Sequence, residues 1–505
     1  MDARQDKGGE EVKYLLAIDQ GTTGSRAVIY DRAGRKVASA YEEFRQHFPR
    51  PGWVEHDPEE IWRSVHHSIQ KALAAVPGGQ ISAIGITNQR ETTIVWDRQT
   101  GRPVYNAIVW QCRRTAGRCE ALKHKKGMDA FVRRRTGLAI DAYFSATKIE
   151  WILKNVPGVA ARARKGEVLF GTTDSWVLWK LTGGKTHATD FTNASRTMLF
   201  DIEKLCWDAD LMKEFGVPRS MLPLVKRSSG EFGFTARIGR LAAGIPICGV
   251  AGDQQAALFG QTCFEPGTIK NTYGTGSFIL LNTGKKRTIS RHGLVTTLAC
   301  GADGKPVYAL EGSVFVAGAA IQWLRDGLKI LPTAAHSENL AACLKDNAGV
   351  YFVPALTGLG APYWDAGARG AIYGITRGTK AVHLARAALE AICYQTKDVL
   401  SAMQKDSGLK LKGLRVDGGA AANNFLCQFQ ADMLGISVVR PKIVEITSLG
   451  AAYLAGLATG YWKNADEIKQ CWQKDRVFNP KMPRAQAARL YAGWQKAVGR
   501  TLSSS

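Results

Sequence analysis

The sequence predicts an α/β fold made of two similar lobes, and three observations lead to this prediction. The chain has 505 residues, more than a single hydrophobic core usually fills. Its first ~90 residues read as three strands, a helix and a fourth strand, an order typical of a mixed sheet. A strand–turn–strand pattern at Lys13–Arg35 then recurs at Lys270–Lys286, as an internal repeat would. We therefore expect two lobes with a boundary near residue 260.

The first hairpin of this pattern is the most informative stretch. The apolar run Tyr14–Ile18 has the length of a strand, and we expect Asp19 to stop it. The small residues Gly21–Ser25 follow, whose backbone can turn tightly and approach an anion closely. A second apolar run, Ala27–Tyr30, and a third that begins at Val37 complete a meander.

The first bend has the chemistry of a phosphate site. Consecutive backbone N–H groups and the hydroxyls of Thr22 and Thr23 would form a concave set of donors beside Gly24. Arg26 adds a charged fork for phosphate, and Asp19 would hold Mg²⁺ through water. The alternative is an ordinary hairpin with an exposed Arg. A P-loop is excluded, because no G-x-x-x-x-G-K-[ST] motif occurs in the chain.

The remaining elements follow from local patterns. Asp57 and Pro58 open a helix whose apolar residues recur every fourth position, and three Gly or Pro residues at 77–79 would end it. A longer helical and loop region is expected from Arg113 to about Lys180. The predicted strands are Ile81–Ile86, Ile94–Trp96, Ile108–Trp110, Ile245–Val250, Phe278–Leu281 and Leu414–Asp417.

Two further Gly-rich turns lie in the second half of the chain. Gly274, Thr275 and Gly276 precede a strand, as in the first hairpin, and Gly418-Gly419 precedes a helix that begins at Asn423-Asn424. Glycine lets a planar base or a ribose approach the backbone, although tight strand–helix packing alone explains the pair equally well. A Gly/Thr hairpin in each lobe would place nucleotide phosphates in a cleft between the lobes.

Composition restricts the class of protein. An apolar content of 45% and a charged content of 22% are typical of a soluble globular chain. No secretory segment is expected in residues 1–12, and the longest apolar stretches, Gly312–Leu324 and Leu449–Trp462, are shorter than a bilayer span. Ten cysteines without a C-x-x-C pair indicate buried thiols, with neither disulfides nor a structural metal. With a C-terminus that lacks a peroxisomal signal, the expected location is the cytoplasm.

The net charge of +23 is unusual for such a chain. Between Arg113 and Lys165, 14 Lys and Arg residues stand against 4 Asp and Glu residues. Such charge suits nucleic acid or an anionic small molecule, but no RNA- or DNA-binding motif accompanies it. We expect a solvated helical face and no nucleic-acid partner.

Four motifs in order resemble those of the FGGY carbohydrate kinases, within the actin/Hsp70/sugar-kinase superfamily. They are DQGTTGSR at Asp19–Arg26, GDQQ at Gly252–Gln255, NTYGTG at Asn271–Gly276 and DGGAAANN at Asp417–Asn424. The resemblance implies two ribonuclease-H-like lobes with the active-site cleft between them. The expected division is a disordered tail at 1–12, an N-terminal lobe at 13–260 and a C-terminal lobe at 261–505.

Other motifs resemble the glycerol-phosphorylating members of that family. They are GITNQRETTIVW at Gly85–Trp96, YNAIVWQCRR at Tyr105–Arg114, NASRTMLF at Asn193–Phe200 and VPALTGLGAPYWD at Val353–Asp365. The resemblance extends over residues 14–497. It implies transfer of a phosphoryl group from Mg-ATP to glycerol, by a cytoplasmic homo-oligomer (a dimer or tetramer) without membrane insertion.

A polyol site must pair donors with acceptors and pack the carbon stem against flat apolar groups. Arg90 and Glu91 suit this need, their charges balancing, provided that both lie beyond the strand that precedes them. Tyr143 would add a hydroxyl, and Trp110 and Phe278 would form the walls. Without the resemblance, we would assign both of these aromatic residues to ordinary core packing.

Asp253 matches the catalytic base of the family. It would accept the proton of the terminal hydroxyl as that hydroxyl attacks the γ-phosphoryl group. The competing interpretation is a cap on the helix Gln254–Phe259. In the family Gln254 also contacts glycerol. The positions that match nucleotide contacts are Thr22, Thr23, Gly24, Arg26, Thr275, Gly318, Gln322, Gly419 and Asn423.

The sequence also bears on regulation and on alternative functions. Some bacterial members carry a Gly-rich loop that binds fructose 1,6-bisphosphate, but Ile238–Ile245 reads IGRLAAGI here, and Ser228–Arg240 has no phosphorylatable His. We expect both controls to be absent. The rivals are a pentulose or other polyol kinase, a two-lobed ATPase that acts as a chaperone or filament protein, and a nucleic-acid-binding protein.

Overall fold

The computed structural model describes residues 13–76 and 80–503. The predicted tail at 1–12 and the predicted helix end at 77–79 lie outside the described residues. The chain forms two compact units, neither of them continuous in sequence. Unit 1 runs to Thr262 and adds Thr297–Val307 and Ile446–Trp472; unit 2 comprises Cys263–Thr296, Tyr308–Glu445 and Gln473–Ser505. The division of the sequence at residue 260 stays a prediction.

Unit 1 is built on a six-stranded mixed sheet in the order β13-β14-β5-β1-β2-β3. β1 pairs antiparallel with β2 and parallel with β5. The strand continues past Ile18 because Asp19 pairs in register with Arg26 and Thr87, so the prediction that Asp19 stops it is wrong. The strands are β1 Lys13–Gln20, β2 Gly24–Tyr30, β3 Lys36–Glu43, β5 Gln80–Asn88, β13 Ser229–Phe234 and β14 Pro246–Gly252.

Helix α1 (Pro58–Ala74) confirms the predicted cap and apolar face. The Asp57 side chain accepts the N–H of Glu59, and Pro58 stands in the first turn, where a missing N–H costs nothing. Ile61, Val65 and Ile69 are buried, while Leu73 is partly exposed. The helix thereby covers β2 and β3.

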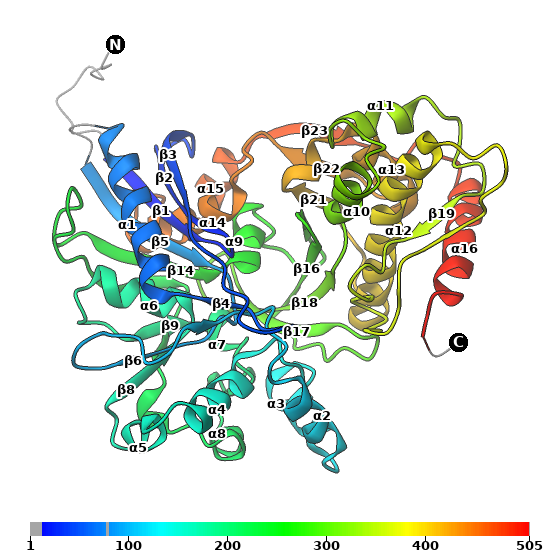
Figure 1. Ribbon diagram of the computed structural model, residues 1–505. Coiled ribbons are helices and arrows are strands. Elements are labelled where there is room, and N and C mark those ends of the chain that lie inside the picture. Colours follow the sequence, from blue (N-terminus) through cyan, green and yellow to red (C-terminus); the bar gives the residue numbers. More distant parts are fainter. Residues whose placement is uncertain (1–12, 77–79, 504–505) are drawn as a thin grey trace, which may run out of the picture. The chain divides into compact units, whose positions relative to one another are not determined.

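Helix α14 (Ile446–Ala458) comes from late in the sequence yet packs on β1, β5, β14 and helix α9 (Asp253–Gly260) of unit 1. In Figure 1 it lies beside the blue strands β1 and β5. Glycines allow this approach: a Cβ on Gly85 would overlap the carbonyl of Ala451, and one on Gly249 would lie 2.6 Å from the nitrogen of Ala455. Backbone therefore meets backbone on the strands that lead to the candidate site.

Unit 2 repeats the topology of unit 1. Its strands follow one another in the sheet in the order β18-β16-β15-β21-β22-β23. β15 pairs antiparallel with β16 and parallel with β21, as β1 does with β2 and β5. The strands are β15 Ile269–Tyr273, β16 Ser277–Gly284, β18 Pro306–Val314, β21 Leu414–Asp417, β22 Val438–Pro441 and β23 Lys474–Phe478. The two-lobed α/β prediction is confirmed.

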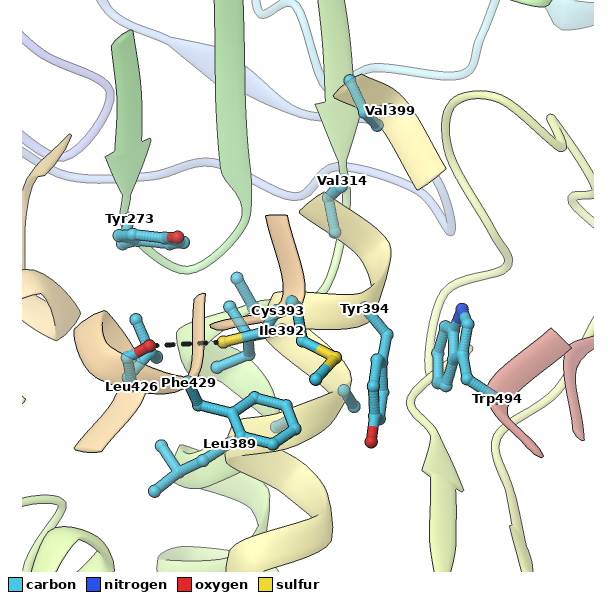
Figure 2. Packing of buried hydrophobic residues seen from close by; sticks show 14 of the residues in the cluster. Tyr273, Val314, Leu389, Ile392, Cys393, Tyr394, Val399, Leu426, Phe429 and Trp494 are labelled. Carbon is cyan, nitrogen blue, oxygen red and sulfur yellow. Dashed lines mark hydrogen bonds between the residues drawn. The ribbon is translucent and has the colours of Figure 1, made fainter. Parts of the chain in front are cut away.

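Helix α12 (Ala381–Ser407) passes through the core of unit 2. Figure 2 shows its Tyr394 ring facing Trp494 of helix α16 (Arg484–Gly499), with ring centroids 5.4 Å apart. The indole N–H of Trp494 donates to the buried Asp398 at 2.8 Å, so the polar edge of this aromatic pair is satisfied.

The region between β5 and β13 of unit 1 contains helices and short strands, and its segment 113–180 is mostly helical, as expected, although it includes strand β8 (Val168–Gly171). Strand β7 is only Ala107–Ile108, so the predicted strand Ile108–Trp110 is wrong beyond Ile108. Its helices are α2 Ala116–His124, α3 Met128–Thr136, α4 Ser145–Asn155, α5 Val159–Arg164, α6 Thr173–Leu181, α7 Phe191–Ala194 and α8 Ala209–Phe215. Among residues 13–76 and 80–503, no helix is long and apolar enough to cross a bilayer.

The basic segment 113–165 is only partly the solvated face that we expected. Arg114 is enclosed, its guanidinium 3.9 Å from the centroid of the Trp53 ring and paired with Glu55. Lys148 is also buried. The pairs Arg113–Asp141 and Arg118–Glu150 offset further charge at the surface. Two of the basic side chains are therefore buried, and one of them, Arg114, pairs with an acid from outside the segment.

The close contact between α9 and α14 predicts that Gly450→Ala destabilises the protein. A Cβ there would overlap the carbonyl oxygen of Ala256, so the two helices must move apart, at a cost of about 1–3 kcal/mol. The matched control is Gly117→Ala in the exposed first turn of α2, where a Cβ has no neighbour within 4 Å. Thermal unfolding should show a lower Tm for Gly450→Ala and an equal or higher Tm for Gly117→Ala; equal melting of both variants would refute the close contact.

Candidate active site

The turn between β1 and β2 is compact and touches Trp110. The N–H of Gly21 donates to the carbonyl of Gly24 at 2.9 Å. A Cβ on Gly24 would lie 2.6 Å from the Tyr41 ring, so only glycine fits. The indole N–H of Trp110 donates to the Thr22 hydroxyl at 3.0 Å. The predicted wall and the predicted phosphate turn are thus in direct contact.

Charges surround this turn. The guanidinium of Arg26 lies 5.4 Å from the centroid of the Tyr41 ring. Burial and the nearby charge of Asp253 together raise the pKa of Asp19 to about 7, although the charge of Arg26 opposes this shift. The predicted metal ligand and the predicted catalytic base therefore influence each other electrostatically.

Asp253 is the first residue of α9, directly after β14. The N-cap is Gly252, so Asp253 is not the N-cap residue of this helix. Its carboxylate accepts the N–H of Gln254 at 2.7 Å and lies 3.2 Å from Nε of Arg90. The Asp253 side chain is 32% exposed, against 2% for Arg90. A buried cation thus orients a carboxylate that a ligand can reach.

Arg90 joins several candidate residues. It lies beyond the end of β5 at Asn88, as we predicted. Its guanidinium donates to Gln255 at 3.2 Å and to the Tyr143 hydroxyl at 3.5 Å, and its Nε lies 3.9 Å from Glu91. Gln255 was not assigned a role from the sequence, although it belongs to the GDQQ motif; its amide also donates to the carbonyl of Leu298.

Glu91 adopts a left-handed backbone conformation, with φ of 63°, which is uncommon for a residue with a Cβ. Its carboxylate is 2.6 Å from Nε of the fully buried Arg196. Its carbonyl accepts the Ser145 hydroxyl at 3.0 Å and the Lys148 ammonium at 3.3 Å. Burial lowers the pKa of Lys148 to about 8, although Glu91 opposes this shift.

Sequence reasoning missed both basic partners of Glu91. Arg196 lies in the quoted NASRTMLF motif, which was the available signal. Nothing distinguished Lys148 from the other cations of the basic segment.

Tyr143 and Trp110 pack edge to face, with ring centroids 5.6 Å apart and planes at 75°. Both are partly exposed, whereas Gln254 is buried. A flat aromatic surface therefore lies next to Arg90 and Glu91. Phe278 belongs to β16 of unit 2, so its pairing with Trp110 across a polyol stays a prediction.

In unit 2 the turn 274–276 joins β15 and β16 and packs against helix α10 (Gly318–Gln322). The N–H of Gly318 donates to the carbonyl of Gly274 at 3.0 Å, and that of Ala317 donates to the carbonyl of Thr275 at 2.9 Å. A Cβ on Gly318 would lie 2.6 Å from the Gly274 oxygen. Thr275 therefore lies in a turn that is hydrogen-bonded to the start of α10, the helix that carries Gly318 and Gln322.

The remaining nucleotide candidates follow β21. Gly418 has φ of 84°, and the chain then forms the 3-10 helix Gly419–Ala422, with open space around the Cα of Gly419. Asn423 caps α13 (Asn424–Leu434) by accepting the N–H of Leu426 at 2.9 Å. The predicted strand, glycine pair and capped helix are confirmed here, and the exposed glycine leaves room for a flat ligand.

Metal-binding groups are sparse in the described part of the chain. There, no three His, Cys, Asp or Glu side chains are grouped so that they could hold an ion. Asp19 and Asp253 form a pair of carboxylates, and Mg²⁺ bound through several waters needs only one or two.

Comparison with known proteins identifies the family. Residues 14–260 match the N-terminal domain and residues 269–459 the C-terminal domain of the FGGY family of carbohydrate kinases. The chain is 60% identical over 493 residues to glycerol kinase 2 of Thermotoga maritima, covering 97% of this chain and 99% of that protein. It is 60% identical over 492 residues to a glycerol kinase of Fusobacterium nucleatum, with 97% and 99% coverage.

Solved structures agree. The crystal structure of Plasmodium falciparum glycerol kinase with ADP is similar over 97% of this chain and 99% of that chain, with a TM-score of 0.92 and 37% identity. The chain therefore belongs to the FGGY family of carbohydrate kinases, a family of phosphotransferases.

The charges around Glu91 predict that Glu91→Gln is strongly destabilising. Its carboxylate pairs with Arg196 and faces Arg90, and all three side chains are almost fully buried. Removing one partner of a buried pair typically costs about 3–5 kcal/mol. Glu42→Gln is the control, because Glu42 pairs at the surface with the exposed Lys71. Thermal unfolding should separate the two variants clearly; equal Tm values would contradict a structural role for the buried charges.

Proposed function

We propose that the protein phosphorylates glycerol with ATP, giving sn-glycerol 3-phosphate and ADP, as a step of glycerol catabolism. The observation that carries this proposal is 60% identity to glycerol kinases over nearly the whole chain. The Arg90, Glu91 and Tyr143 group of unit 1 supports it, because a small neutral polyol needs donors and acceptors beside a flat apolar surface.

Asp253 is the catalytic base of this proposal. Its carboxylate accepts the proton of the terminal hydroxyl while the hydroxyl oxygen forms a bond to the γ-phosphorus and the bond to ADP breaks. Such a transfer passes through a loose transition state, so orientation and charge stabilisation supply most of the acceleration. The ion pair with Arg90 supports this role, because it holds the carboxylate in a fixed direction next to the polyol-binding groups.

The polyol contacts are assigned as follows. Arg90 and Tyr143 donate to glycerol oxygens, Glu91 accepts from a glycerol hydroxyl, and Gln254 adds an amide. Trp110 and Phe278 enclose the carbon stem. The left-handed backbone of Glu91 supports its role, since such a conformation persists only where surrounding contacts enforce it.

ATP binds through both units in this proposal. The phosphates meet Thr22, Thr23, Gly24 and Arg26 of unit 1 and Thr275 of unit 2. The nucleoside meets Gly318, Gln322, Gly419 and Asn423. Mg²⁺ is held by Asp19 through water, where it would offset the repulsion between Asp19 and Asp253 and neutralise charge on the phosphates. Assembly into a dimer or tetramer stays a prediction.

The first test is Asp253→Asn, assayed as ADP release from Mg-ATP with glycerol, a pentulose or no polyol. Loss of the base should lower kcat by about 10²–10⁴-fold while both substrates still bind. Asp466→Asn is the control, because Asp466 also stands in a first helical turn, that of α15 (Ala465–Cys471), but its side chain is 78% exposed.

Three results would count against the proposal. A preference for pentulose would overturn the substrate assignment. Turnover without any polyol, unaffected by Asp253→Asn, would indicate an ATPase of another kind. An equal loss in Asp466→Asn would show that the effect of the Asp253 change is not specific to the site.

The second test concerns the metal. Chelation by EDTA should stop glycerol-dependent ADP release, and added Mg²⁺ should restore it. Asn in place of Asp19 should raise the Mg²⁺ concentration needed for half-maximal rate, because the neutral amide attracts the hydrated cation less strongly. An unchanged Mg²⁺ requirement in Asp19→Asn would remove Asp19 from the metal site.

A further inference from the structure

The turn that follows β1 has all three of its carbonyl oxygens held by the protein. Gly21 O accepts from the amides of Gln20 at 2.7 Å and Gln89 at 3.2 Å. Thr22 O accepts from Nε2 of Gln46 at 3.0 Å. Thr23 O accepts the N–H of Phe44 at 3.2 Å.

Holding these carbonyls determines where the N–H groups point. In a trans peptide the C=O of one residue and the N–H of the next point in opposite directions. The N–H groups of Thr22, Thr23 and Gly24 are therefore directed away from the donors that hold Gly21 O, Thr22 O and Thr23 O. A rotated peptide would present a carbonyl to an approaching phosphate, which repels the anion.

His56 forms hydrogen bonds with both Gln46 and Gln89. It lies on the short strand β4 (Glu55–His56) and is fully buried, with the Phe44 ring edge-on at 5.0 Å. Nδ1 accepts from Nε2 of Gln89 at 3.4 Å, so Nε2 carries the proton and donates to Oε1 of Gln46 at 2.7 Å. Burial and the charge of His47 lower the pKa of His56 to about 3, so the ring is neutral and can both donate and accept.

The ring takes part in orienting both amides. Because Oε1 of Gln46 accepts from His56, its NH₂ group is directed to Thr22 O. Oε1 of Gln89 accepts the Thr92 hydroxyl at 3.0 Å, which turns its NH₂ group toward His56 and Gly21 O. The imidazole thus orients the amide that holds Thr22 O, and it helps Thr92 and Gln20 to orient the Gln89 amide at Gly21 O.

We propose that His56 is a positioning residue for phosphoryl transfer. Through Gln46 and Gln89 it fixes the peptide planes of the turn 21–24, so that their N–H groups meet the phosphates of ATP. This inference rests on the proposed function, which assigns Thr22, Thr23 and Gly24 to phosphate. His56 itself touches neither substrate.

The experiment measures KM for ATP, KM for glycerol, kcat and Tm in full-length variants. Gln46→Met removes the donor to Thr22 O with little change of volume and should raise KM for ATP about tenfold, the effect of one hydrogen bond of ordinary strength, with KM for glycerol unchanged. His56→Phe should raise it further, since Gln46 and Gln89 each lose one hydrogen-bond partner. His56→Gln should recover part of the loss, because an amide also donates and accepts.

His67→Phe, on the exposed face of α1, is the control and should behave as the parent. A lower Tm with unchanged KM for ATP in Gln46→Met and His56→Phe would overturn the positioning role. The variant Arg26→Gln distinguishes a failure of the positioning role from a failure of the proposed function. If Arg26→Gln raises KM for ATP and Gln46→Met does not, only the positioning role is refuted; if neither does, the phosphate assignment of the turn falls, and the inference with it.

Discussion

The structure of unit 1 depends on the close packing of α14 against the centre of its sheet. Gly85, Gly249 and Gly260 remove the side chains that would keep this helix at its usual distance, and Gly450 does the same from the helix itself. β5, β14 and α9 are the elements in contact, and they carry Arg90 and Asp253 at their ends. The separation between these two residues is thus set by backbone packing, which is stiffer than packing through long side chains.

Within unit 1, buried charged side chains organise the candidate site. Arg90 lies between Asp253 and Glu91, and Glu91 in turn pairs with Arg196. Two guanidiniums and two carboxylates balance, so the low-dielectric interior can hold them. Of the two carboxylates, Asp253 keeps a third of its side chain accessible while that of Glu91 is almost fully buried. The less buried carboxylate, Asp253, is therefore the one that we propose as the base.

Local patterns predicted the parts of this architecture that local forces decide. The capped helix α1, strand β21 and the Asn423 cap follow from periodicity and capping within a few residues. The end of β1 does not follow from local patterns, because Asp19 remains in the strand through pairing with Arg26 and Thr87 of other strands. Arg196 and Lys148 were missed for a similar reason: their burial follows from contacts with Glu91, which is far away in the sequence.

The repeated topology hides a difference in how each unit orients its Gly/Thr turn. In unit 2, backbone N–H groups of Ala317, Gly318 and Ala319 donate to the carbonyls of Gly274 and Thr275, so the first turn of a helix orients these peptides. In unit 1, the side-chain amides of Gln20, Gln46 and Gln89 and the N–H of Phe44 hold the carbonyls, and His56 contacts two of these amides, those of Gln46 and Gln89. Both solutions leave the opposite faces of the peptides free to donate, because a trans peptide cannot point both groups the same way. Side-chain amides can rotate and a helix cannot, so the turn of unit 1 needs a ring such as His56 to fix them, and the turn of unit 2 does not.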